Sequence, residues 1–199
     1  MSNELLGTVD HIGAAKTPAP SITGFHHIAY RCRDAEETRK FYCDLLGLKP
    51  AAALAFDKSP GTGKDHPFMH LFFEMGDGKF IAFFDEPTSA RDDVFRIKDG
   101  IEDYHFAFEV SSMEEIQTFI SRFKEAKVPV FGPIDHHFCH SIYFFDPNGL
   151  ACEITVRDAK HDEIMKAEGD RAAQAIHEWT EKTRALKKTR LKLLSQAAD

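Results

Sequence analysis

Hydrophobic and polar positions alternate along residues 25–32, and this period of two predicts a strand. Asp34 follows as a helix N-cap, and apolar residues at three- and four-residue spacing then predict a helix that ends at Gly47. Two aromatic strands are expected around 68–75 and 79–85, joined by a Gly-Asp-Gly hairpin signal. The first half of the chain therefore predicts a strand, a helix and further strands, in that order.

The same order of elements returns in the second half, which indicates an internal repeat. Gap-free overlays of the two halves match these pairs: His27 with His105, Ala29 with Ala107, Phe72 with Tyr143, His70 with Ser141, and Ala82 with Glu153. The repeat predicts an α+β fold of two β-α-β-β-β modules, over about 23–85 and 103–156, in one domain spanning 23–156.

Two flanking segments and a connection complete the predicted organisation. Residues 1–22 contain Gly and Pro with little periodicity and are interpreted as an N-terminal tail, and the Asp- and Arg-rich residues 85–103 as a linker. Residues 157–199 are predicted to be a C-terminal helical extension with apolar residues at steps of three and seven and a locally basic end. We expect this helix to pack on its own domain or on a partner subunit, rather than to bind RNA or lipid.

Composition narrows the class of protein without defining its chemistry. The 199 residues carry a net charge of −7, with 25 Lys and Arg against 32 Asp and Glu, which argues against a nucleic-acid binder. No apolar run approaches the roughly 18 residues of a membrane span, and no signal peptide is recognised, so we expect a cytoplasmic protein without a membrane partner. The four scattered cysteines are expected to be reduced thiols. The 11 histidines are unusual and direct attention to a metal.

Strand parity gathers the polar candidates on one side of the predicted sheets. Side chains alternate between the two faces of a strand, and the apolar sets are expected beneath the helices. His27, His105 and Glu153 fall on the opposite faces, with Tyr143 and Ser141 on an adjacent strand. Two His and one carboxylate form the ligand set of facial-triad iron enzymes, which leave coordination positions open for substrate and O₂. We therefore expect His27, His105 and Glu153 to bind a divalent first-row metal.

The chain resembles the vicinal oxygen chelate superfamily, which includes glyoxalase I, bleomycin- and fosfomycin-resistance proteins, epimerases and type I extradiol dioxygenases. The resemblance rests on residues 26–30, 41–48, 105–108 and 141–149, the last followed by Glu153. It implies paired modules that form a cupped eight-stranded mixed sheet around a central divalent metal. It also implies a homodimer, since members of the superfamily often pair modules between chains.

Within this superfamily the resemblance is closest to single-domain extradiol dioxygenases. Glyoxalase- and epimerase-like members usually take a fourth ligand from the first module, where this chain has Ala82. Three ligands are similar to the extradiol dioxygenases and to the fosfomycin-resistance transferases, and Tyr143 stands ten residues before Glu153, as the catalytic Tyr does in extradiol enzymes. The implied activity is Fe(II)-dependent ring cleavage of a small catechol-like substrate. The alternatives are a lyase or isomerase that uses Mn, Zn, Ni or Co, and a non-enzymatic, drug-sequestering protein.

Ring cleavage also needs a group that can exchange protons near the metal, and an imidazole with a near-neutral pKa is suitable. His136 and His70 are the preferred candidates, because the first lies just before the last hairpin and the second shares parity with Phe72. The neighbouring histidines at 137 and 140 are weaker choices. One feature departs from the extradiol pattern: the acid–base His of that family would fall near Arg91, where no His occurs.

Overall fold

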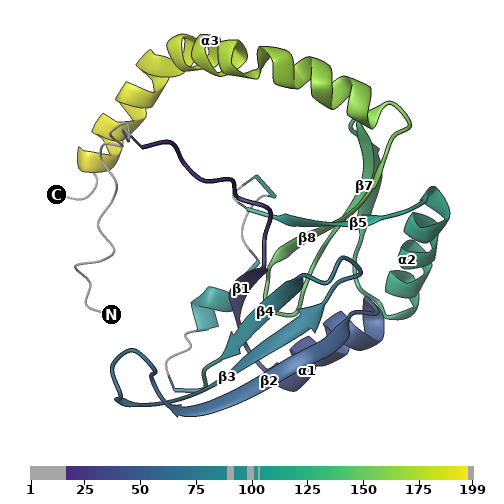
Figure 1. The fold of residues 1–199 in the computed structure, drawn as a ribbon, viewed down its shortest axis with the longest axis vertical. Helices are drawn as coiled ribbons and strands as arrows, with labels where there is room; N and C mark the ends of the chain where they lie inside the picture. The colour runs from purple at the N-terminus through teal and green to yellow at the C-terminus, as the bar shows by residue number, and fades with distance from the viewer. Residues whose placement is uncertain (1–16, 89–91, 98–100, 103, 197–199) are drawn as a thin grey trace.

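The computed structural model of the protein describes residues 17–88, 92–97, 101–102 and 104–196 and contains two four-stranded sheets (Figure 1). The first has the order β1-β4-β3-β2, and its strands are β1 (His27–Cys32), β2 (Lys49–Lys58), β3 (Asp65–Glu74) and β4 (Phe80–Asp85). The second has the order β5-β8-β7-β6, and its strands are β5 (Phe106–Val110), β6 (Phe131–Asp135), β7 (Cys139–Phe145) and β8 (Ala151–Arg157). In each sheet the first two strands in this order are parallel and the others antiparallel. The predicted α+β fold of repeated modules is confirmed.

The strand register reproduces the overlay expected from the sequence. Ala82 of β4 lies opposite Phe72 of β3, and Glu153 of β8 lies opposite Tyr143 of β7. The hairpins that precede β4 and β8 both contain a glycine with positive φ, +77° at position 78 and +78° at position 149, a conformation that favours residues without a Cβ atom. The two modules therefore share one backbone plan down to the positions of individual side chains.

Each module has a helix between its first two strands. In the first, α1 (Ala35–Arg39) is capped by Asp34, whose Oδ1 accepts from the Glu37 amide at 2.7 Å, and it continues as the π-helix η2 (Lys40–Leu45). The sequence predicted one helix here, and the wider η2 turns bury the two adjacent aromatics Phe41 and Tyr42. In the second, α2 (Met113–Glu125) is a regular helix capped by Ser112.

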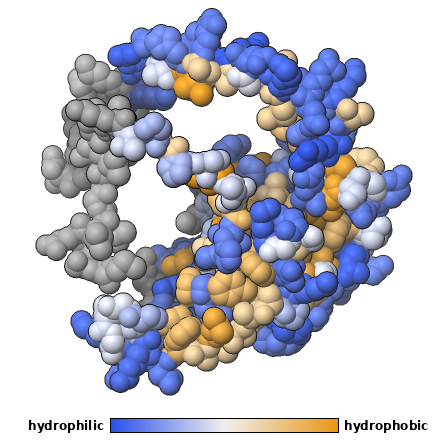
Figure 2. All heavy atoms as spheres, in the orientation of Figure 1, coloured by the Kyte–Doolittle hydropathy of each residue, from blue (hydrophilic) through white to orange (hydrophobic). Residues whose placement is uncertain are grey.

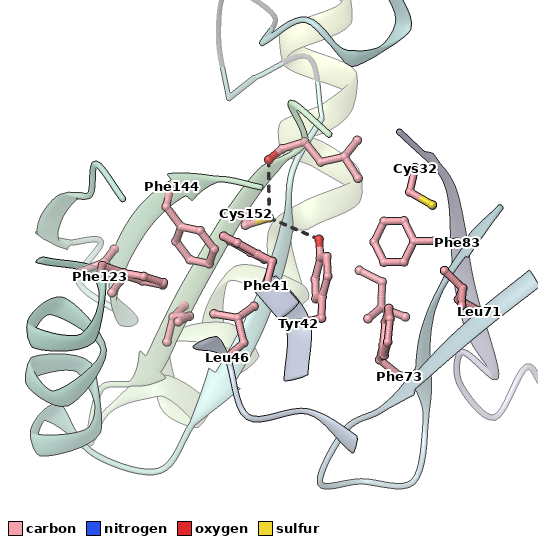
Figure 3. Packing of buried hydrophobic residues seen from close by; sticks show 14 of the residues in the cluster. Cys32, Phe41, Tyr42, Leu46, Leu71, Phe73, Phe83, Phe123, Phe144 and Cys152 are labelled. Atoms are coloured by element: carbon pink, nitrogen blue, oxygen red, sulfur yellow. Dashed lines mark hydrogen bonds between the residues drawn. The ribbon is translucent and has the colours of Figure 1, made fainter. Parts of the chain in front are cut away.

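The hydrophobic core lies between the two sheets and joins the modules into one body. Figure 3 shows the aromatic residues of η2 between Phe123 and Phe144 of the second module and Phe73 and Phe83 of the first. Tyr42 stacks on Phe73, with ring centroids 5.7 Å apart, and is fully buried. The prediction that the apolar faces of the strands pack beneath the helices is confirmed.

Outside the two modules, α3 (His161–Gln196) confirms the predicted C-terminal helix, and a 3₁₀ turn, η3 (Asp92–Phe95), lies in the connection between the sheets. Within the described ranges, no helix has both the length and the apolar composition that a membrane crossing requires. All four cysteines are free, and three of them are buried. Most of the expected N-terminal tail and Arg91 lie outside the described residues.

Candidate functional site

The second module brings three of the predicted residues together on the sheet face away from the helices. Glu153 is buried on β8, and its Oε2 lies 3.1 Å from Nε2 of His105, which precedes β5. Tyr143, on the neighbouring β7, lies opposite Glu153. Burial first and the Glu153 charge second raise the pKa of the Tyr143 phenol, while a hydrogen bond involving Ser141 opposes the rise. At neutral pH the phenol therefore keeps its proton.

His136 extends this group of residues. Its Nε2 lies 2.9 Å from the hydroxyl of Tyr143, within hydrogen-bond distance. His136 was predicted because it lies just before the last hairpin. In the structure it contacts the predicted catalytic residue Tyr143. A phenol in contact with an imidazole on one side and a carboxylate on the other is suited to moving a proton.

The contacts of His105 direct its Nε2 at the Glu153 carboxylate, where a proton or a metal ion can lie between them. Its Nδ1 lies 2.8 Å from the carbonyl oxygen of Ile101, which can only accept, so Nδ1 carries a proton. In the neutral imidazole, Nε2 then directs a lone pair at the Glu153 carboxylate. Two acceptors at 3.1 Å are favourable only with a proton or a metal ion between them.

A second group of residues occupies the corresponding face of the first module. His27 is exposed at the start of β1, with its Nδ1 2.8 Å from Nδ1 of His26. Its ring lies 6.2 Å from that of His70 and 5.5 Å from that of Phe72, measured between centroids. Where the second module has Glu153, this module has Ala82, which is fully buried and carries no polar group.

His70 is held within an aromatic wall and has an unsatisfied nitrogen. Its ring stacks on Phe84 with centroids 3.8 Å apart and lies 4.2 Å from Phe72. Its Nε2 is buried and has no hydrogen-bond partner among the described residues. Burial first and the neighbouring His27 second lower the pKa of His70, which favours the neutral imidazole. Such a nitrogen is suited to a hydrogen bond with a bound molecule.

The two groups of residues do not meet within one chain. Tyr30 of β1 and Phe106 of β5 stack with centroids 5.4 Å apart, so the apolar faces of these strands are turned toward each other. The faces that carry His27 and His105 are consequently turned apart, because side chains alternate along a strand. Among the described residues, no group of three or more His, Cys, Asp or Glu side chains is arranged to hold a metal ion.

The other two histidines considered as acid–base residues, His137 and His140, lie outside both groups of residues. His140 lies 3.4 Å from Asp158 and 3.8 Å from Asp135, so its ring is directed toward these two carboxylates rather than toward the site. His137 is exposed in the turn before β7 and has a positive φ of 70°. Both were the weaker choices among the acid–base candidates.

Two features of this region were not predicted from the sequence. Phe84 forms the base of the aromatic wall, and its parity with Ala82 along β4 was the available signal. The second feature is a groove of about 960 Å³ along the open edge of β5, which depends on the packing of the two sheets. Its lining includes Ile28, Phe80, His105, Ala107 and Glu109.

The residues of the second module fit a divalent metal. Two ligand atoms that each lie about 2.1 Å from a metal, at a right angle, are about 3 Å apart, close to the 3.1 Å between His105 and Glu153. The bond from Nδ1 of His105 to a backbone carbonyl is the outer contact that commonly orients a metal-binding imidazole. A third ligand would have to come from another face.

Comparisons with known proteins agree with this architecture. The family model described as the Glyoxalase/Bleomycin resistance protein/Dioxygenase superfamily matches residues 24–154. No curated protein matches the chain. The solved structures include a glyoxylase/bleomycin resistance protein/dioxygenase domain from Frankia sp. EAN1pec, with 18% identity and a TM-score of 0.56, which covers 69% of this chain and 100% of that one.

A glyoxalase/dioxygenase from Nostoc punctiforme is 26% identical, with a TM-score of 0.55 over 73% of this chain and 99% of that one. The genomically encoded fosfomycin resistance protein FosX from Listeria monocytogenes is 20% identical, with a TM-score of 0.51 over 71% and 98% of the two chains. Other crystals of FosX contain Mn(II). From the family match over residues 24–154, together with the paired modules, we conclude that this chain belongs to the Glyoxalase/Bleomycin resistance protein/Dioxygenase superfamily.

Proposed function

We propose that this protein is an Fe(II)-dependent, extradiol-type dioxygenase of a small catechol-like aromatic, working as a homodimer. In this proposal the metal is held by His105 and Glu153 of one subunit and by His27 contributed from the other. The observation that carries the proposal is the pair formed by His105 and Glu153 at 3.1 Å, with the phenol of Tyr143 beside it.

The second subunit is needed because the two faces of one chain are turned apart. β1 and β5 are the outer strands of their sheets, and no described strand pairs with their outer edges. Open edges are ready to accept another strand through backbone hydrogen bonds. Pairing β1 of one copy with β5 of the other would join two four-stranded sheets, with His27 and His105 on the same face. A two-fold axis would then create two equivalent sites.

The ligand count favours a dioxygenase over a lyase or isomerase. Ala82 occupies the position in the first module from which a fourth ligand would come. It is fully buried and has no atom that can bind a metal. Two neutral imidazoles and one carboxylate would leave positions free for a substrate and O₂. Bound at this site, Fe(II) would supply the redox chemistry that ring cleavage by O₂ requires.

The protein's own groups have separate tasks in this proposal. Tyr143, whose raised pKa keeps it protonated, donates a hydrogen bond to a substrate oxygen and exchanges its proton with His136 at 2.9 Å. The neutral His70 offers its buried Nε2 to the second hydroxyl of the substrate. Phe72 and Phe84 hold the aromatic ring by stacking and exclude water from it.

A mixing experiment tests whether the site is shared. The variants His27→Ala and Glu153→Gln are each expected to lose bound metal when purified alone. Co-expressed with different tags, they form mixed dimers in which one of the two sites has all of its ligands. The mixture should then recover about a quarter of the wild-type metal content, since half of randomly paired dimers are mixed. A mixture that holds no metal would contradict the shared site.

Metal analysis and oxygen uptake test the reaction itself. Protein purified without added metal under anaerobic conditions is expected to contain iron near one atom per chain and to consume O₂ with members of a catechol panel. Zinc, nickel or cobalt at that level, with activity indifferent to O₂, would instead support a lyase or isomerase. Tight binding of small molecules by a metal-free protein would support a sequestering function.

A further inference from the structure

The C-terminal helix α3 leaves the domain after its first turn, and its polar contacts with the other described residues are few. Among the described residues, its hydrogen bonds and ion pairs to the rest of the chain all come from its first turn: His161 and Asp162 contact Phe138, Arg157 and Asp158, and the Ile164 amide donates to the Lys160 carbonyl. Figure 1 shows α3 as an arch that is separated from both sheets along most of its length. At about 1.5 Å per residue, its 36 residues span about 54 Å. Most helices in proteins are stabilised by packing an apolar face, and the other described residues provide α3 with little such packing.

The helix carries an apolar stripe that meets this need. Met165, Trp179 and Leu186 lie at steps of 14 and seven along the sequence, and Ile176 lies three residues before the tryptophan. A seven-residue repeat with these offsets is the pattern by which one helix packs along another. These four side chains are between 47% and 72% exposed, and apolar atoms interrupt the polar surface of α3 in Figure 2. Thr183 shares the stripe but is already buried, so the argument rests on the four exposed residues.

The charges on α3 are divided between its two halves. Residues 161–181 contain six Asp and Glu against two Lys and Arg, whereas residues 182–196 contain six Lys and Arg and no acidic residue. Lys166 and Arg171, the two basic residues of the first half, are already paired with Asp170 and Glu168. Compensation of the helix dipole explains opposite charges only in the first and last turns. It does not account for a division that runs the length of the helix.

From the apolar stripe and the divided charge we infer that α3 packs antiparallel against α3 of a second copy of this chain. Antiparallel packing sets the acidic half of each helix beside the basic half of the other, whereas parallel packing sets like charges together. The two-fold axis passes near Trp179, at the middle of the helix, where Ile176 and Trp179 of both copies form the centre of the interface. The inference is independent of the proposed metal site, because none of these residues is one of its proposed ligands.

Disulfide trapping tests both the contact and its direction. In a Cys43→Ala background, Trp179→Cys is expected to form an inter-chain disulfide under mild oxidation, because it lies close to the two-fold axis. Met165→Cys is expected to form none, because in an antiparallel pair its two copies are about 40 Å apart. Ala185→Cys, on the opposite side of the helix, is the control for random collision. Disulfides at both Met165→Cys and Trp179→Cys would overturn the antiparallel arrangement, and none at either would overturn the pairing.

A charge on the stripe should then disrupt the contact without touching the metal site. Leu186→Glu is expected to reduce the disulfide yield of Trp179→Cys several-fold, while Ala185→Glu leaves it unchanged. The metal content of Leu186→Glu should remain that of the wild type, which separates this inference from the proposed function. Co-sedimentation of the wild-type protein with phosphatidylserine vesicles, lost in Leu186→Glu and without any disulfide trapping, would overturn the inference in favour of a lipid surface.

Discussion

The two modules share one backbone plan but carry different chemistry at the same register. In the first, the pair Phe72 and Ala82 faces away from the helices. In the second, Tyr143 and Glu153 occupy the equivalent positions, with His105 and His136 in contact with them. The carboxylate, the phenol and the imidazoles that contact them are thus gathered in the second module, and the aromatic wall lies in the first. A repeat that joins these two faces across a dimer would combine a reactive side and a binding side in one cavity.

The β-hairpins that close the modules differ in the same sense. In the first module, Asp77 is exposed in the turn and pairs with Lys79 beside it. In the second, Asp146 is buried and accepts hydrogen bonds from the hydroxyl of Tyr42 at 3.0 Å and from the backbone amide of Leu150 at 2.8 Å. Asn148 adds a contact to Thr38 of α1. Among the described residues, hydrogen bonds link the second turn but not the first to the other module, so equivalent substitutions in the two turns should have unequal effects.

The largest expected effect concerns the metal. Glu153→Gln removes the charge of the proposed ligand in the second module while keeping its shape, and we expect metal affinity to fall by at least about 100-fold. Glu125→Gln, at the exposed end of α2, is the matched control and should not change it. Isothermal titration of the metal-free protein measures both. Equal affinity in the two variants would remove Glu153 from the proposed site.

The next effect distinguishes the two hairpin turns by stability. Asp146→Ala leaves the Tyr42 hydroxyl and two backbone amides without their acceptor inside the protein, and we expect a loss of about 3 kcal/mol in the free energy of unfolding. Asp77→Ala should cost less than about 0.5 kcal/mol, because its partners are exposed to water. Urea denaturation followed by circular dichroism compares them. Similar losses would mean that the buried turn does not connect the modules energetically.

A smaller effect compares the aromatic residues at the same register. Tyr143→Phe removes the hydroxyl that contacts His136, and we expect it to lower unfolding stability by about 1 kcal/mol and to reduce turnover far more than substrate binding. Phe72→Tyr, the reciprocal change, adds a hydroxyl to the proposed binding wall and is expected to change KM more than kcat. Steady-state kinetics of the iron-loaded variants separates kcat from KM. A Tyr143→Phe variant with unchanged kcat would exclude the phenol from proton exchange.

The smallest effect is a pH dependence. Burial raises the pKa of Asp146 above its ordinary value of 3.8, although several hydrogen bonds to the carboxylate oppose the rise. Between 3.8 and the higher pKa of the folded state, the folded chain holds a proton that the unfolded chain has lost. The stabilisation that comes from this bound proton is therefore fully present below pH 3.8. It is lost as the pH rises through the pKa of Asp146 in the folded state.

Asp146→Asn does not titrate, so its unfolding free energy should fall less than that of the wild type as the pH rises from about 4 to neutrality. Chemical denaturation at several pH values measures the difference, which cancels the contributions of the other carboxyl groups. Parallel curves for the two proteins would mean that the fold does not raise the pKa of Asp146.

The sequence supplied much of the candidate site because strand parity is a local property. Alternation along β5 and β8 was enough to put His105 and Glu153 on one face, and the repeat paired Tyr143 with the same face. The contact between Tyr143 and His136 was less accessible, because it depends on how the turn before β7 folds back. The aromatic wall around His70 required knowledge of which side chains stack, which alternation alone does not provide.

The amino-acid sequence was sufficient to predict the two modules, their register, the apolar and polar faces of the strands, and the C-terminal helix. These follow from side-chain periodicity and from short-range signals such as the Asp34 cap and the glycines of the turns. The directions of the two polar faces, in contrast, depend on the tertiary packing of the sheets. The two polar faces are turned apart because residues such as Tyr42 and Phe144 bury the apolar faces of the sheets against one another. No local sequence pattern predicts how two sheets that are far apart in the sequence pack together. The same limit applies to α3, whose stripe was visible in the sequence but whose departure from the domain was not.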